Sequence, residues 1–252
     1  MPFATPIRTV HATDLAPRLP PPFTLVRLRE RGDAFGHARH IAAEAGAGTL
    51  VHVGRFDAAE FALVLEPEEP LSRARRAFHA GMAALADALA AHAPPETLID
   101  IKWPGALTVN LGLVGGGRLA WPYGAAETDV PDWLVFGAMV RTASPDSEPG
   151  ADPDVTALTE EGFGETGAID VVESFARNMM LYLDAWQDGS FSAVADSYLR
   201  RLARGGDSAS IADNGDLLLR HAGNGTTDRR ALMSALATDD AGLFDRHPER
   251  RP

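Results

Sequence analysis

The residue best suited to chemistry in this sequence is Lys102, which stands in the tripeptide Lys102-Trp103-Pro104. It is the only lysine among the 23 lysines and arginines of the chain. A lysine ammonium is a compact, strongly hydrated point charge that approaches one oxygen closely, whereas a guanidinium is a planar fork. This lysine therefore indicates an anionic ligand at position 102. The alternative is an ordinary strand lysine that faces solvent.

Three consecutive glycines, Gly115, Gly116 and Gly117, follow this lysine along the chain. Glycine has no side chain, so a ligand can come close to its backbone and the N–H groups can bind an anion. We expect the glycines to form a turn that faces Lys102 and suits a carboxylate or phosphate. The alternative is a hairpin that needs the glycines only for positive φ angles.

Two further groups of residues could bind a ligand. Arg55 follows Gly54 and is a candidate for neutralising a phosphate, although it could equally be an exposed turn arginine. His37 and His40 are spaced so that one helix face could present both rings to a metal. No Asp or Glu stands where it would complete that ligand set, so we predict no metal site.

Composition excludes several functions. The net charge of −12 argues against binding to nucleic acid or to an anionic membrane, because both need a basic surface. The absence of cysteine excludes disulfides, zinc–thiolate sites and a cysteine nucleophile. No apolar run is typical of a signal peptide or a membrane span, so we expect a cytoplasmic protein.

The hydrophobic pattern indicates the elements that must position these residues. Apolar spacing and turn residues predict strands over 23–28, 49–53, 60–65, 98–103, 107–110 and 133–140, and helices over 34–45, 71–92, 169–187 and 191–203. Strands and helices do not alternate strictly. The order therefore favours an α+β fold, with a mixed or antiparallel sheet that carries helices on one side.

Composition also suggests domain boundaries. Residues 1–22 end in a run of prolines and are predicted to form an extended arm, followed by a main domain over 23–204. Residues 205–252 are predicted to form a small C-terminal module, with a hairpin around Asn214-Gly215 and a last helix that starts near Thr227.

The segment that begins at Lys102 resembles the signature strand of the biotin/lipoate protein ligase family. That signature reads Lys-Trp-Pro-Asn-Asp, followed by a Lys-Leu-Ala-Gly-type turn. This sequence has Lys102-Trp103-Pro104-Gly105-Ala106, and later Leu113-Val114-Gly115-Gly116-Gly117. The resemblance covers about residues 23–203 and points to a ligase-like branch of unknown function with a short extra C-terminal domain.

The resemblance implies a class II synthetase-like fold and a two-step reaction. Biotin, lipoate or a similar acid attacks ATP, bound with Mg²⁺, to form an acyl-adenylate, and the acyl group passes to a lysine of an acceptor domain. It implies that Lys102 is the catalytic residue, holding the oxygens on which charge develops. The substrate-binding residues it implies are Arg55, Trp103, Pro104, Gly115, Gly116, Gly117 and Gly137.

Two departures from the family affect the nucleotide half of the site. The Gly-Arg-Gly-Arg-x-Gly-Arg loop should follow the strand at 49–53, but only Gly54-Arg55 fits that pattern. The Asn-Asp pair is replaced by Gly105-Ala106, which cannot supply a carboxylate. The sequence therefore leaves three hypotheses: an acyl–protein ligase or transferase, a non-catalytic module that binds a ligand or an acceptor domain, and a scaffold.

Overall fold

The structure is a computed structural model that describes residues 16–144, 154–188, 191–203 and 206–239. Most of the predicted N-terminal arm, residues 1–15, and the last part of the predicted module, residues 240–252, lie outside the described residues. The elements, in chain order, are β1 (Thr24–Leu28), α1 (Ala34–Ala45), β2 (Thr49–Val53), β3 (Ala58–Leu65), α2 (Leu71–Ala74), α3 (Ala77–Ala90), β4 (Ile99–Lys102), β5 (Ala106–Val109), β6 (Gly112–Ala120), β7 (Leu134–Arg141), α4 (Ala168–Asp188), α5 (Ser192–Arg201), β8 (Ser208–Ile211), β9 (Leu217–Arg220), β10 (Thr227–Arg230) and α6 (Leu232–Asp239).

The main sheet has seven strands in the order β1-β2-β3-β7-β6-β5-β4. β1 pairs with β2 in parallel, and every other neighbouring pair is antiparallel. The sheet is therefore mixed, and the predicted α+β class is confirmed. β3, β7 and β6 occupy the middle of the sheet, while β4, which carries Lys102, is an edge strand.

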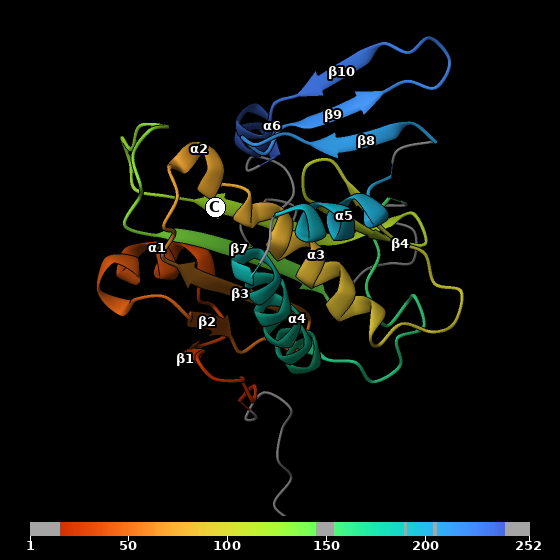
Figure 1. Cartoon of the computed structure of the whole chain (residues 1–252). Helices are drawn as coiled ribbons and strands as arrows, with labels where there is room; N and C mark the ends of the chain where they lie inside the picture. The colour runs from red at the N-terminus through yellow and green to blue at the C-terminus, as the bar shows by residue number, and fades with distance from the viewer. Residues whose placement is uncertain (1–15, 145–153, 189–190, 204–205, 240–252) are drawn as a thin grey trace, which may run out of the picture.

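Helices cover both faces of this sheet. α3 and α4 pack together on one face, and α5 packs against α3 and β4 (Figure 1). Three aromatic side chains are fully buried between these helices and the sheet: Phe61, Phe136 and Phe175. The rings of Phe136 and Phe175 are stacked, with their centroids 5.7 Å apart. We call this the helix-pair face.

α1 packs against β2, β3 and β7 on the opposite face, which we call the α1 face. The prediction of helices on one side only is therefore wrong. The reason lies in the connection, because α1 joins the parallel neighbours β1 and β2, and a crossover of this kind is almost always right-handed. The handedness selects the face, and the sequence of α1 alone does not reveal it.

The long helix predicted over residues 71–92 is interrupted between α2 and α3. Around the interruption, Arg76, Phe78 and His79 donate backbone hydrogen bonds to residues three positions earlier, as in a tight 3₁₀ turn. Both arginines of the junction are buried: Arg75 pairs with Glu127 and Arg76 with Glu69. The apolar pattern of the sequence continues through the junction and does not reveal it.

The C-terminal residues form a three-stranded antiparallel sheet, β8-β9-β10, which lies beside α6 at the top of Figure 1. The hairpin predicted at Asn214-Gly215 is confirmed, with Gly215 at φ +85°. The helix predicted to start near Thr227 begins instead at Leu232, because 227–230 pairs with β9 as a strand. The Leu232 N–H donates to the Asp216 carboxylate at 3.0 Å, which fixes the start of α6.

This hairpin turn binds directly to the main domain. Arg75 Nε donates to the Asn214 carbonyl at 2.7 Å, and His79 Nε2 donates to the Gly215 carbonyl at 2.9 Å. Leu217 of β9 and Leu232 of α6 belong to the same apolar core as α3. The C-terminal sheet is thus anchored on buried polar groups of the main domain.

We predict that His79 makes the unfolding free energy depend on pH. Burial is the main cause that lowers the pKa of His79 to about 4, whereas the unfolded chain takes up this proton near 6.5. The unfolded state then binds more protons, so stability falls as pH is lowered from about 6.5 to about 4, by up to about 1.4 kcal/mol per pH unit per histidine. Burial also lowers the pKa of His52 to about 4, so both histidines contribute in one direction.

Urea unfolding at a series of pH values measures this slope. His79→Gln should reduce this slope by the amount that corresponds to about one proton taken up on unfolding. His40→Gln, at an exposed position, is the control and should leave the slope unchanged. Equal slopes for the wild type and His79→Gln would contradict the assignment.

Candidate functional site

One row of residues across the α1 face connects two of the predicted site residues, Lys102 and Gly116. Glu60 lies opposite Met139, Met139 opposite Gly116, Gly116 opposite Ala106, and Ala106 opposite Lys102. Residues directly opposite one another on neighbouring strands share a face. Strands lie about 4.8 Å apart, so Lys102 is separated from Gly116 by about 10 Å of sheet surface. Two predicted site residues therefore share one surface.

Lys102 stands at the open end of this row. Its side chain is exposed and forms no ion pair with any residue in the described part of the chain. Asp100, two residues earlier, shares its face; partial burial raises the pKa of that carboxyl, opposed by the positive charges of Arg201 and Lys102. Lys102 is thus placed to pair with an anion at the edge of the sheet.

Trp103 and Pro104 face the helices rather than this surface. The Trp103 ring lies 5.8 Å from the His79 ring and 6.4 Å from the Tyr198 ring. The Tyr198 hydroxyl donates to the Pro104 carbonyl at 2.7 Å, and Tyr198 is fully buried. These contacts attach the β4–β5 turn to α3 and α5 and so position Lys102. A direct contact of Trp103 or Pro104 with substrate stays a prediction.

Gly115, Gly116 and Gly117 lie inside β6 and do not form the predicted turn. β6 pairs with β5 on one side and β7 on the other, and this pairing keeps the glycines extended. A Cβ at Gly115 would lie 1.9 Å from the Met139 carbonyl oxygen, and one at Gly117 would lie 2.5 Å from Met82 Sδ. These two glycines therefore permit close packing. Gly116 faces the α1 side, in the row of Lys102.

The space next to Gly137 is occupied by a protein side chain. A Cβ at Gly137 would lie 2.4 Å from Cδ2 of Phe35, which comes from the first turn of α1. The resemblance implied that this glycine lets a ligand pass close to the strand. In the structure the Phe35 ring fills that space, so a ligand would reach Gly137 only if the ring moved.

Arg55 lies in the short connection between β2 and β3, on the α1 side of the sheet. Its Nε donates to Asp57 at 2.9 Å, and a second guanidinium nitrogen lies 3.8 Å from the buried Glu60 carboxylate. Glu60 also accepts the Ala34 N–H at 3.2 Å, at the start of α1. The charge of Arg55 is thus already balanced by two carboxylates. A phosphate would have to compete with both, and phosphate binding by Arg55 stays a prediction.

Arg118 is a cation of this surface that the sequence interpretation missed. Its guanidinium lies 4.1 Å over the Phe35 ring and 3.5 Å from the Asp33 carboxylate, the N-cap of α1. A strand through Gly116 places Arg118 on the same face two residues later. The alternation of side chains along a strand could have predicted this position of Arg118 from the sequence. The prediction of a turn at the glycines excluded such a strand.

The described residues hold no group of three or more His, Asp or Glu side chains that could bind a metal ion. Within the same residues, no helix is long and apolar enough to cross a membrane. The α1 face offers charged groups for chemistry, among them the cations Lys102 and Arg118 and the Arg55–Glu60 ion pair.

The mixed seven-stranded sheet flanked by helices, with a Lys-Trp-Pro motif at its edge, defines the class: a biotin protein ligase-like catalytic fold. The model of the biotin/lipoate A/B protein ligase family matches residues 19–200, and the chain belongs to this family. A search of curated proteins found no match.

Solved structures agree with this assignment. A biotin protein ligase-like protein of unknown function from Silicibacter sp. TM1040 is 28% identical, with a TM-score of 0.75 over 87% of this chain and 99% of that one. The biotin protein ligase of Aquifex aeolicus shares 14% identity, with a TM-score of 0.62 over 83% of this chain and 99% of that chain. The Leishmania major enzyme in complex with biotinyl-5-AMP shares 17%, with a TM-score of 0.52 over 84% and 99% of the respective chains. The last two likenesses concern the fold alone.

We predict that Gly115→Ala lowers the unfolding free energy by about 2 kcal/mol or more, because β6 and β7 must separate to admit the methyl group. Gly223→Ala is the matched control, since nothing lies within 4 Å of the position that its methyl group would take. It should change stability by less than about 0.5 kcal/mol. Urea unfolding measures both variants. Equal stability of the two would show that Gly115 is not needed for packing.

Proposed function

We propose that this chain binds a carboxylic acid of the biotin, lipoate or fatty-acyl type on the α1 face and activates it or transfers it to a lysine of an acceptor protein. The observation that carries the proposal is the row from Lys102 through Ala106 to Gly116, a cation followed by two small residues on one surface. Lys102 is exposed, Ala106 is half-buried and Gly116 is buried.

Each residue has a part in this proposal. The Lys102 ammonium pairs with the carboxylate or the developing oxyanion of the acyl group, where a positive charge stabilises the transition state. The acyl chain lies over the small residues Ala106 and Gly116. Arg118 supplies a second positive charge on the same strand as Gly116, held in orientation by Phe35 and Asp33.

The proposal has two versions, which differ in whether pyrophosphate is released. In the activation version ATP is the co-substrate, and the support comes from the biotin protein ligase of Aquifex aeolicus, whose structure is known in complex with biotin and ATP. Binding of Mg²⁺-ATP by this chain would fall to the β2–β3 connection, where Arg55 stands. Transfer from an acyl carrier is the version that needs no nucleotide.

A non-catalytic binding module is the second candidate, and the carboxylates around Arg55 favour it. Asp57 and Glu60 already pair with the arginine that would meet a phosphate. On this candidate the protein holds an acyl ligand or an acceptor domain and performs no turnover. Ligand-dependent stabilisation without any reaction is its signature.

Titration calorimetry with biotin, lipoate and octanoate tests the shared part of both candidates. Lys102→Ala should weaken binding of the preferred acid by about tenfold or more, because a hydrogen-bonded charge pair is worth about 1.5–3 kcal/mol. Lys102→Arg should also weaken binding, since the planar guanidinium cannot approach one oxygen as closely. Arg220→Ala, at another exposed strand cation, is the control and should bind normally.

If the acids bind the wild type and Lys102→Arg equally well, Lys102 does not hold the carboxylate. If none of the acids binds, the acyl-ligand proposal is wrong. Acid-dependent exchange of pyrophosphate into ATP, together with transfer of labelled acid to an acceptor protein, then separates the enzyme from the binding module.

A further inference from the structure

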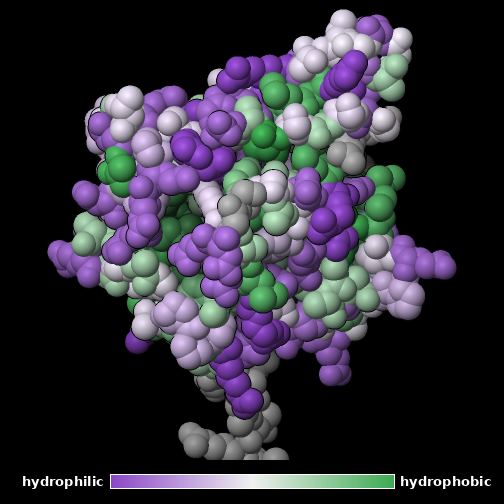
Figure 2. All heavy atoms as spheres, viewed as in Figure 1, coloured by the Kyte–Doolittle hydropathy of each residue, from purple (hydrophilic) through white to green (hydrophobic). Residues whose placement is uncertain are grey.

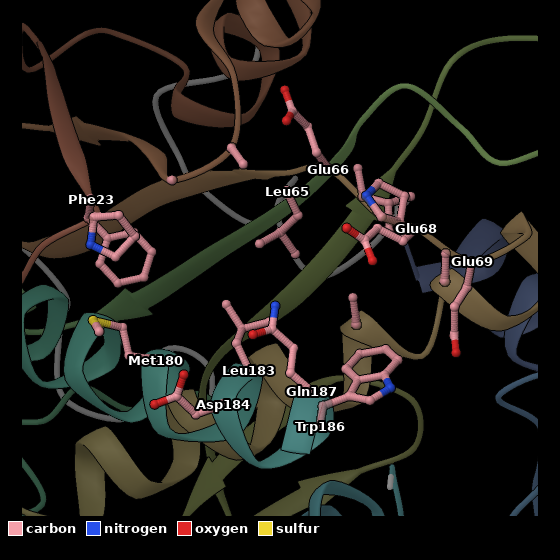
Figure 3. A pocket seen from close by; sticks show the side chains of 17 residues that line it. Phe23, Leu65, Glu66, Glu68, Glu69, Met180, Leu183, Asp184, Trp186 and Gln187 are labelled. Atoms are coloured by element: carbon pink, nitrogen blue, oxygen red, sulfur yellow. The ribbon is translucent and has the colours of Figure 1, made fainter. Parts of the chain in front are cut away.

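A pocket of about 590 Å³ opens on the helix-pair face, away from the surface that carries Lys102. Its walls are the turn after β3 and the C-terminal half of α4, and the ends of β3 and β7 close it below (Figure 3). The volume falls within the range of about 300–1,000 Å³ that is usual for small-molecule sites. Helix α4 and the paired ends of β3 and β7 contribute to its lining, together with the turn after β3.

The inner lining of this pocket is apolar. Leu65 and Leu134 come from the strand ends, and Leu183 and Trp186 come from α4 (Figure 3). In the space-filling view of the same side as Figure 1, a recessed green area edged with purple lies left of the centre (Figure 2). An apolar body of a ligand would therefore lose its water on entering.

The rim of the pocket is acidic on both sides. Glu68 stands on the turn after β3, and Asp184 stands on α4 across from it, while the carboxylate of Glu66 points away from the pocket toward the end of α1 (Figure 3). None of these three carboxylates has an ion-pair or hydrogen-bond partner among the described residues. A fourth, Glu69, is neutralised by Arg76 at 2.7 Å.

We propose that this pocket is a binding site for an organic amine, a small molecule with an aliphatic body and an ammonium group. The aliphatic body occupies the floor at Leu65 and Leu183, and the ammonium pairs with Asp184 or Glu68 at the rim. Only a ligand with an aliphatic body and an ammonium group can contact the apolar floor and also pair with the rim carboxylates. A carboxylic acid would bring its charge against the rim carboxylates, and a neutral alcohol would leave them without a counter-charge.

The rim geometry makes the ion pair favourable. The carboxylates are exposed, so they keep part of their hydration and the ammonium need not lose all of its own water. The neighbouring apolar wall lowers the local dielectric and strengthens the attraction relative to bulk water. This site is separate from the one proposed for the acyl group, because the two lie on opposite faces of the sheet and take ligands of opposite charge.

Titration calorimetry with octylamine, octanol and octanoate tests the proposal on the full chain. Octylamine should bind saturably, and octanol and octanoate should bind at this pocket about tenfold more weakly or not at all. The double variant Glu68→Gln/Asp184→Asn should weaken octylamine binding by about tenfold. Asp188→Asn, one turn further along α4 and outside the pocket lining, is the matched control and should bind as the wild type does.

Lys102→Ala separates this site from the acyl site, because it should leave octylamine binding unchanged while it weakens binding of the acid. Thermal unfolding without ligand shows that each variant is folded. The amine site is overturned if octylamine fails to bind, if octanoate competes with it at equal affinity, or if the double variant binds octylamine as tightly as Asp188→Asn. Failure of acid binding with octylamine binding intact would remove the acyl proposal alone.

Discussion

The packing of helices on the central sheet depends on glycines that large side chains approach closely. Phe35 of α1 packs where a Cβ of Gly137 would stand, on one face of the sheet. On the other face, Met82 and Phe136 crowd the position of a Cβ at Gly117. With side chains at these glycines, neither α1 nor α3 could lie as close to the sheet.

The fold could be predicted from the sequence wherever local signals and tertiary structure agree. Residues 34–45 and 49–53 form the expected helix and strand at the expected bounds. Asn214-Gly215 turns where predicted because that dipeptide accepts the positive φ of Gly215. The prediction of a turn at residues 115–117 was wrong, because glycine is compatible with both a turn and an extended strand. Pairing with β5 and β7 decides between them, and pairing partners are not visible in one sequence.

At the candidate site, too, the sequence predicts the strand but not the direction of each side chain. The motif around Lys102 locates the strand and, through the family, suggests the chemistry proposed above. It does not reveal that Trp103 and Pro104 face the helices while Lys102 faces the other side. That distinction comes from registers across five strands, from β4 to β3. The place of Arg118 on the α1 face also follows from the strand register, because β6 continues through the glycines.

The two proposed sites of this acidic protein present different charges, and this difference argues for separate ligands. Lys102 and Arg118 place positive charge on the α1 face, where the acyl group of the proposed function carries its negative charge. Glu68 and Asp184 place negative charge around an apolar hollow on the helix-pair face. A net charge of −12 makes unpaired carboxylates common, but it does not place them on opposite walls of a pocket with an apolar floor. On these two proposals, an anionic and a cationic ligand bind on opposite faces of one sheet, because each pairs with the opposite charge that its own site presents.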